Sequence, residues 1–227
     1  AELNHGRFSF ITKYSAGHTG SWSIDDLSQK LLQTKALLGK ESLRTLLAHD
    51  PLELAGGDGH KNLNLFRGLR ESGEIAQIGV SIYDPEDLEE IRNWKVLDVV
   101  QAPLNLFDQR LVRSGWLERL NEAGVEVHTR SSFLQGVLLT KPERLPDRVS
   151  FLRDSLTILR DKVQASGLTM AQACMSYPLS YEGVSGVLIG VTTDAELTEL
   201  LASVQDNPVV KIDAPNIPKD WVDPRKW

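Results

Sequence analysis

The chain has 227 residues, of which 41% are hydrophobic and 25% are charged, and its formal net charge is -6. This length suits one large domain or two small ones, and the acidic balance excludes a general affinity for nucleic acid or anionic lipid, because phosphate groups bind to basic surfaces. The single cysteine, Cys174, excludes an internal disulfide framework and a cysteine-rich zinc site. The sequence has no apolar run near the ~20 residues that a membrane helix needs and no signal-peptide pattern, so the cytoplasm is the expected location.

Short β-type segments alternate with longer helical patterns along the chain. Segments rich in Val, Ile, Leu, Phe or Thr predict strands over residues 7–13, 43–49, 75–81, 97–103, 125–131 and 184–190. One helix is predicted to begin after Ser23, with Asp26 at the capping-box position, and another after Asp84, where Pro85 and two acids follow. Further helices are predicted over residues 61–72, 109–122, 148–165, 169–180 and 194–203, and residues 55–59 are predicted to form a surface loop.

The alternation of strands and helices predicts a parallel sheet with helices packed outside it. No linker of the domain-boundary type interrupts the chain, so residues 1–227 are interpreted as one domain with a short C-terminal tail over 205–227. Lys13 and His49 are each the last residue of a predicted strand, and Ser81, Gln101 and Arg130 also lie at or near strand ends. Polar residues at the C-terminal ends of successive parallel strands are typical of the functional face of a (β/α)8 barrel or an open α/β sheet.

Several common catalytic motifs are absent from the sequence. Residues 39–42 lack the upstream glycine and the hydroxyl of a phosphate-binding loop, and no strand is followed by the Gly-x-Gly-x-x-Gly of a dinucleotide-binding Rossmann fold. The five histidines have no metal-ligand spacing, so no metal site is predicted.

Six short segments, each at or near the end of a predicted strand, form a pattern across the chain. They are Phe-Ile-Thr-Lys at 10–13, Leu-Leu-Ala-His-Asp-Pro at 46–51, Ile-Gly-Val-Ser at 78–81, Val-Val-Gln-Ala-Pro-Leu-Asn at 99–105, Thr-Arg-Ser-Ser-Phe-Leu-Gln-Gly at 129–136 and Val-Leu-Ile-Gly-Val-Thr-Thr at 187–193. In this order and spacing the chain resembles the aldo-keto reductase family from about Arg7 to Thr198. Its closing residues 223–227 are similar to the tail of a bacterial subgroup.

The resemblance implies a (β/α)8 barrel of aldo-keto reductase type, N-terminally incomplete in this chain. It implies reduction of an aldehyde or ketone to an alcohol, with NADP as the cofactor and NAD as the alternative. The implied catalytic residues are Lys13 and His49: in the family, the lysine's charge lowers the pKa of a tyrosine that protonates the carbonyl oxygen, and the histidine orients the carbonyl. The implied partner is a small carbonyl substrate, with no nucleic acid or membrane, and the oligomeric state stays open.

The resemblance also implies cofactor-binding residues. Ser81 and Gln101 match positions that hold the nicotinamide carboxamide, and Arg130 takes the place of a stacking tyrosine. The pyrophosphate loop matches residues 131–136, with Ser131, Phe133, Gln135 and Gly136, and the loop that holds the adenosine phosphate matches Gly190, Thr192 and Thr193. Glu196 stands where family members often have a basic or amide residue, and residues 190–206 contain no Lys or Arg. A 2′-phosphate therefore lacks its usual partner, which weakens the assignment of NADP.

The chain departs from the family before its lysine strand. The family's catalytic Asp and Tyr belong there, and the first two βα units of an eight-stranded barrel have no match in this chain. A truncated or incompletely resolved chain, a natural deletion, and strands lent by another chain are the three explanations. Tyr14 neighbours Lys13, but consecutive residues of a strand point to opposite faces, so Tyr14 is not expected to replace the tyrosine. Without a proton donor we expect cofactor binding but carbonyl reduction at least ~100-fold slower than with the missing units restored.

Two other functions stay open. A catalytically silent relative that binds nucleotide or regulates a partner is consistent with the unmatched Asp and Tyr. A different (β/α)8 enzyme, such as a lyase or aldolase, would use Lys13 for a Schiff base, but the settings of Ser81 and Gln101 argue against it.

Each candidate residue also has a structural interpretation. Lys13 at a strand end is compatible with a salt bridge, and His49 with a hydrogen bond to Asp50 or to a backbone carbonyl. Gln101 and Asn105 are compatible with a role in satisfying the polar groups of loops.

Overall fold

The computed structural model describes residues 9–16, 22–39, 43–204 and 212–227. The chain divides into two compact units: unit 1 comprises Ala1–Gln101 with Glu122–Glu126, and unit 2 comprises Ala102–Asn121 with Val127–Trp227. Six strands form one sheet in chain order, and the strand pairings within each unit are parallel. The predicted parallel sheet is therefore confirmed, whereas the interpretation of residues 1–227 as one domain stays a prediction.

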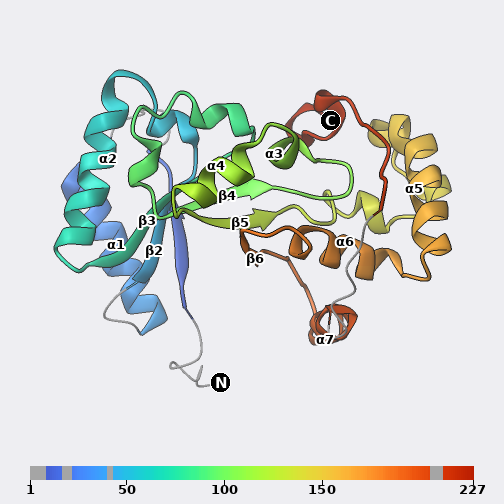
Figure 1. The fold of residues 1–227 in the computed structure, drawn as a ribbon. Helices are drawn as coiled ribbons and strands as arrows, with labels where there is room; N and C mark the ends of the chain where they lie inside the picture. Colours follow the sequence, from blue (N-terminus) through green and yellow to red (C-terminus); the bar gives the residue numbers. More distant parts are fainter. Residues whose placement is uncertain (1–8, 17–21, 40–42, 205–211) are drawn as a thin grey trace. The chain divides into compact units, whose positions relative to one another are not determined.

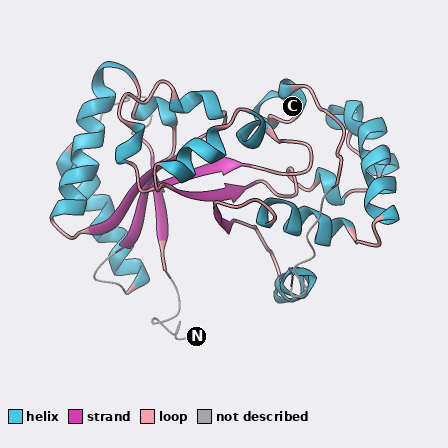
Figure 2. Cartoon of the chain, in the orientation of Figure 1, coloured by secondary structure: helices cyan, strands magenta, loops and turns pink. Residues whose placement is uncertain are grey.

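Unit 1 contains the first strands and the two helices that cover them (Figures 1 and 2). Its elements are β1 (Ile11–Tyr14), α1 (Ile24–Leu38), β2 (Leu43–Ala48), α2 (Gly56–Glu71), β3 (Ile75–Ser81) and the first part of β4 (Val99–Pro103). The helices bury apolar side chains such as Leu27 and Leu31 of α1 and Phe66 of α2. The predicted strands are confirmed with small differences at their ends, and Arg7 and Phe8 lie outside the described residues.

The predicted beginning of α1 is confirmed in its hydrogen bonds. The Ser23 hydroxyl accepts a hydrogen bond from the Asp26 backbone N–H at 3.1 Å and donates one to the Asp26 carboxylate at 2.7 Å. A side chain at this position satisfies one of the backbone donors that a helix leaves open at its beginning.

The predicted helix after Asp84 is wrong, because that segment forms 3-10 turns. Asp84 and Asp87 form a capping box, but the turn that follows is the 3-10 helix Pro85–Leu88. Buried residues recur here at a spacing of three, at Pro85, Leu88 and Ile91. Three residues per turn is the period of a 3-10 helix, so this spacing keeps all three side chains on the buried side.

The predicted surface loop over residues 55–59 is also wrong, because α2 begins at Gly56. A Cβ atom on Gly59 would lie 2.3 Å from the carbonyl carbon and oxygen of Leu54. The glycine that looks like a loop residue in the sequence therefore lets the first turn of the helix approach the backbone of the preceding segment.

Unit 2 holds the remaining strands and most of the helices. Its elements are α3 (Arg110–Arg113), α4 (Trp116–Glu122), β5 (Glu126–Arg130), α5 (Arg153–Ala165), α6 (Met170–Leu179), β6 (Val184–Val187) and α7 (Asp194–Val204), with the first residue of β5 and the last of α4 counted in unit 1. The single helix predicted over 109–122 is interrupted at Gly115, which has a φ of 77°. The helix predicted over 148–165 begins with the 3-10 segment Asp147–Leu152 and becomes α5.

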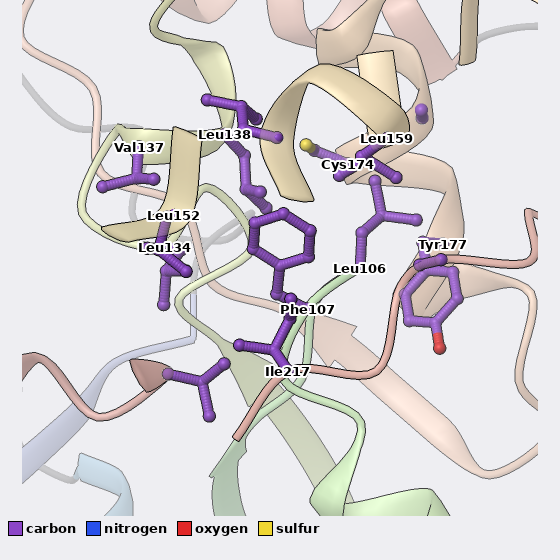
Figure 3. Close-up of a cluster of buried hydrophobic side chains, with 14 of the residues drawn as sticks. Leu106, Phe107, Leu134, Val137, Leu138, Leu152, Leu159, Cys174, Tyr177 and Ile217 are labelled. Atoms are coloured by element: carbon purple, nitrogen blue, oxygen red, sulfur yellow. The ribbon is translucent and has the colours of Figure 1, made fainter. Parts of the chain in front are cut away.

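A cluster of buried apolar side chains forms the core of unit 2 (Figure 3). It includes Leu106 and Phe107 after β4, Leu134 after β5 and Cys174 of α6. Residues of the predicted tail also belong to this cluster, among them Ile217, whereas residues 205–211 lie outside the described part of the chain. The core therefore fixes the two loops that follow β4 and β5 in unit 2.

Within the ranges that the structure describes, no helix has the length and apolar character needed to cross a membrane.

Candidate active site

Lys13 and Tyr14 lie on opposite faces of β1. The Tyr14 hydroxyl donates a hydrogen bond to the Lys30 carbonyl of α1 at 2.6 Å and also bonds to the Thr34 hydroxyl. Because side chains alternate along a strand, Lys13 projects from the face away from α1. This arrangement agrees with the expectation that Tyr14 does not act together with Lys13.

The strand register of unit 1 places four predicted site residues on the same face of the sheet. Lys13 pairs with Leu47, and Ser81 pairs with Gln101. His49 directly follows Ala48, which pairs with Val80, so it stands beside Ser81. Ser81 and Gln101 are buried, Lys13 is half-buried and His49 is exposed.

The Lys13 side chain extends along this face as far as β4. Its ammonium group donates a hydrogen bond to Oε1 of Gln101, whose side chain is completely buried. The other end of the amide, Nε2, is also buried and has no hydrogen-bond partner among the residues that the structure describes. A buried amide N–H without a hydrogen-bond acceptor is uncommon, because it lowers the stability of the protein by about 1–3 kcal/mol. A hydrogen-bond acceptor is therefore expected at this position.

Glu53 was not predicted as a site residue, yet it joins the segments that follow β1 and β2. It belongs to the 3-10 turn Pro51–Glu53, is 6% exposed, and its Oε1 accepts hydrogen bonds from the Ser15 hydroxyl at 2.7 Å and from the Ala16 backbone N–H. Ser15 comes two residues after Lys13, and Glu53 comes four residues after His49. Glu53 thus ties together the chain segments that carry the two predicted catalytic residues.

Asp50, which the structural interpretation of His49 offers as a partner, also has a role of its own in the following turn. Asp50 caps the turn, since its Oδ1 accepts a hydrogen bond from the Leu52 backbone N–H at 2.9 Å. The His49 backbone N–H continues the ladder between β1 and β2 with a 2.8 Å hydrogen bond to the Tyr14 carbonyl.

In unit 2, residues 131–136 form a tight loop with an unusual backbone. Four of its residues have positive φ: Ser131 at 63°, Leu134 at 46°, Gln135 at 54° and Gly136 at 84°. For residues other than glycine this conformation is strained, and such strain persists only where the surroundings hold it.

Two contacts hold this loop. The Leu134 side chain is 1% exposed and lies in the unit 2 core. The buried Asn105 donates from Nδ2 to the Ser131 carbonyl at 3.0 Å, while its Oδ1 accepts the backbone N–H groups of Phe107 and Asp108. The structural interpretation of Asn105 is therefore confirmed.

The other predicted residues of this loop are more open. Arg130 donates a hydrogen bond to the Ser131 hydroxyl at 3.2 Å, Phe133 is half-buried and packs on the unit 2 core, and Gln135 is exposed. The second predicted loop begins beside it, because the Leu188 backbone N–H donates to the Thr129 carbonyl at 2.7 Å. Each of these two residues comes two positions before its loop, so the structure brings the starts of both loops together.

The loop over residues 190–193 leads into α7, and the carboxylate of Glu196 folds back onto it. Glu196 Oε2 accepts hydrogen bonds from the backbone N–H of Thr192 at 2.7 Å and from its hydroxyl at 2.9 Å, and Thr193 Oγ1 accepts the Glu196 backbone N–H at 3.2 Å. The pKa of the Glu196 carboxyl is lowered from its ordinary value, and the backbone hydrogen bond from Thr192 contributes most to this shift. At neutral pH a negative charge from the chain itself therefore occupies this helix N-terminus.

Sequence comparison assigns the chain to a family. The family model described as the aldo/keto reductase family matches residues 29–217, and the chain belongs to this family. It is 29% identical over 153 residues to L-glyceraldehyde 3-phosphate reductase of Escherichia coli, covering 57% of this chain and 44% of that protein. It is 26% identical over 163 residues to an uncharacterized oxidoreductase of Bacillus subtilis, covering 66% and 53% of the two chains. The chain thus spans about half the length of these relatives.

Solved structures agree on the fold. An aldo-keto reductase from Bacillus halodurans in its apo form superposes with a TM-score of 0.72 at 17% identity, covering 97% of this chain and 72% of that one. A thermostable aldo-keto reductase in complex with the inhibitor epalrestat gives a TM-score of 0.61 at 20% identity, covering 89% and 66%. With the six parallel strands, these neighbours confirm the predicted (β/α)8 barrel fold, present here in part.

Proposed function

We propose that this chain carries the cofactor and substrate residues of an NAD(P)H-dependent reductase that converts an aldehyde or ketone to an alcohol. Its family and its reductase relatives support an oxidoreductase. The observation that favours the finer statement is the hydrogen bond between the half-buried Lys13 and the buried Gln101, which places a positive charge beside an unsatisfied amide donor.

The residues of unit 1 fit the nicotinamide end of such a cofactor. An open amide donor on Gln101 suits the oxygen of a carboxamide, and the hydroxyl of the neighbouring Ser81 can donate or accept. When bound, the cofactor would supply a hydride to the carbonyl carbon.

The two predicted catalytic residues would act on the carbonyl oxygen. As negative charge develops on that oxygen, the ammonium group of Lys13 would stabilise it, and a hydrogen bond from His49 would orient it. Because Lys13 is half-buried, its charge is less screened by water than that of an exposed lysine.

The residues of unit 2 are proposed to hold the phosphate end. The strained loop with Ser131, Phe133, Gln135 and Gly136 and the loop with Gly190, Thr192 and Thr193 begin side by side, as a site for one extended ligand requires. Arg130, at the base of the first loop, is proposed to contact the cofactor. A 2′-phosphate does not fit beside Glu196, so the predicted NADP is supported less well than NAD.

The proposed function is tested with the purified protein and reduced coenzyme. We expect saturable binding of NADH or NADPH, followed by the fluorescence of the bound coenzyme, and consumption of that coenzyme when nitrobenzaldehyde is added. Lys13→Met is expected to slow this consumption by about 100-fold, because it removes the charge that stabilises the developing alkoxide, which would then take its proton from water. Absence of saturable binding by the wild-type protein would overturn the proposal.

Coenzyme choice is expected to change at Glu196. Replacing this carboxylate by the neutral amide in Glu196→Gln removes the charge at the helix N-terminus but keeps an acceptor for Thr192. The Kd for NADPH is then expected to fall by roughly fivefold, as for a single exposed charge interaction, while the Kd for NADH stays the same. Equal changes for both coenzymes would show that Glu196 lies away from the 2′-phosphate.

A further inference from the structure

We propose that Glu53 is a positioning residue for the reaction: its buried carboxylate holds the end of β1 in place and thereby sets where the Lys13 ammonium group lies. This inference rests on the proposed function, which assigns Lys13 to the carbonyl oxygen of the substrate. It concerns contacts within unit 1, between the end of β1, the turn after β2, and α2.

The position of Lys13 depends on what holds the end of β1. This strand has four residues, stands first in the sheet and pairs along one side with β2. Ser15 and Ala16 follow it directly, and Oε1 of Glu53 accepts a hydrogen bond from the Ser15 hydroxyl at 2.7 Å and another from the Ala16 backbone N–H. A short strand at the end of a sheet has few ladder hydrogen bonds, so these two contacts are a large part of what keeps its end in place.

A second buried side chain, Asn62 of α2, fixes the turn that carries Glu53. Nδ2 of Asn62 donates a hydrogen bond to the Glu53 backbone carbonyl at 2.7 Å, and Oδ1 accepts one from the Trp22 backbone N–H at 3.2 Å. The Trp22 ring lies against the ring of Phe66 in α2, with the two centroids 4.7 Å apart. The turn is therefore anchored on α2, and its carboxylate offers a fixed acceptor to the end of β1.

The burial of the Glu53 carboxylate indicates a role beyond packing. Glu53 is 6% exposed, and its Oε2 is buried with no hydrogen-bond partner among the residues that the structure describes. Taking a carboxylate oxygen out of water without a partner destabilises a fold, and an apolar side chain of similar volume is often at least as stable in such a place. Proteins keep unfavourable local choices of this kind mainly at functional sites. Glu53 fits this pattern, because it comes four residues after His49 and bonds to the segment that follows Lys13.

The test compares the purified wild-type protein with matched variants. Glu53→Met removes both carboxylate oxygens but keeps the length of the side chain, and Glu53→Gln keeps Oε1 as an acceptor without the charge. Ser15→Ala removes one of the two donors and is also combined with Glu53→Met. Glu71→Gln is the control, because Glu71 is an exposed acid of α2 in the same unit.

Four quantities are measured for each protein. They are kcat for the consumption of NADH with nitrobenzaldehyde, the Kd for NADH, the midpoint of unfolding in urea, and the hydrogen-exchange rates of the backbone amides of residues 13–16. The exchange rates report on the end of β1 without coenzyme, so they separate a displaced strand from a failure of the chemistry.

We expect Glu53→Met to lower kcat by about tenfold, because a small displacement of Lys13 weakens its stabilisation of the developing alkoxide. The amides of residues 13–16 are expected to exchange about tenfold faster in this variant. The Kd for NADH and the unfolding midpoint are expected to stay at the wild-type values, since the residues assigned to the coenzyme lie on other strands and loops and an apolar side chain suits the buried position.

The remaining variants show which group acts. Glu53→Gln is expected to keep kcat within about threefold of the wild-type value, because Oε1 still accepts the hydrogen bonds although the charge is lost. The combination of Ser15→Ala with Glu53→Met is expected to have the kcat of Glu53→Met alone, since Ser15 acts through the carboxylate. Glu71→Gln is expected to match the wild-type protein in all four measurements.

Three results would overturn the inference. In the first, Glu53→Met keeps the wild-type kcat. In the second, kcat falls together with the unfolding midpoint and the affinity for NADH, as a purely structural role requires. In the third, kcat falls while the amides of residues 13–16 exchange as in the wild-type protein, which would show that Glu53 acts elsewhere. A wild-type protein that fails to bind or to consume NADH would refute the proposed function itself, and the inference with it.

Discussion

Gly79→Ala is expected to destabilise the protein by about 3 kcal/mol or more, because there is no space for a methyl group in the middle of β3. A Cβ atom at this position would lie 2.1 Å from the Val99 carbonyl oxygen and 2.6 Å from Cδ2 of Leu47. A leucine side chain can move, but the carbonyl belongs to the backbone of the neighbouring strand, so the pairing of β3 with β4 would have to open. This pairing also carries Ser81 and Gln101.

The measurement is the free energy of unfolding in urea, with Gly68→Ala as the matched control. Gly68 lies inside α2, and a Cβ atom there would meet nothing within 4 Å. Alanine is favoured over glycine in a helix interior, so this variant is expected to gain roughly 0.5–1 kcal/mol. If Gly79→Ala unfolded at the same urea concentration as the wild-type protein, this result would contradict the packing described for β3.

Cys174 is expected to react with a thiol reagent about 1000-fold more slowly in the folded protein than in urea, at mildly alkaline pH. Its side chain is 0% exposed in the unit 2 core (Figure 3). Burial raises the pKa of the Cys174 thiol to about 12, although the charge of Arg160 acts in the opposite direction. The thiolate is the reactive form, and a pKa this far above the ordinary thiol value lowers the thiolate fraction by about a thousandfold.

The raised pKa of Cys174 also predicts a dependence of stability on pH. The folded state keeps the thiol neutral, whereas the unfolded chain can ionise it above its ordinary pKa of about 8.5. The free energy of unfolding is therefore expected to fall as the pH rises from about 8.5 towards the folded value, and Cys174→Ala should lose this part of the slope. In the labelling experiment with the thiol reagent, equal rates in the folded and the unfolded protein would show that the Cys174 thiol is accessible, which would contradict both predictions.

The elements of the fold were largely predictable, because they depend on patterns within short segments. The content of β-forming residues predicted β3 at its observed bounds, and the cap formed by Ser23 and Asp26 predicted the start of α1. Errors arose where a local pattern has two explanations. The role of Gly59 depends on how closely Leu54 approaches, and the 3-10 turns after Asp84 depend on which side chains are buried.

The candidate site was predictable as a set of residues but not as a set of contacts. Strand ends and the family pattern identify Lys13 and Gln101, but 88 positions separate them, and their hydrogen bond depends on the register of four strands and on the reach of a lysine. No sequence pattern identified Glu53 as a site residue, because an acidic residue shortly after Asp50-Pro51 is typical of any capped turn. The sequence showed that basic residues are absent around Glu196, whereas the structure adds that its carboxylate bonds to Thr192.

The proposed cofactor site can be observed directly in a crystal structure of the protein with NADH or NADPH bound. We expect the carboxamide oxygen within hydrogen-bond distance of Gln101 Nε2, and the phosphates against residues 131–136 and the loop that ends at Thr193. A dinucleotide bound at the N-terminal ends of the strands, with Nε2 of Gln101 still without a hydrogen-bond partner, would contradict the proposed cofactor site.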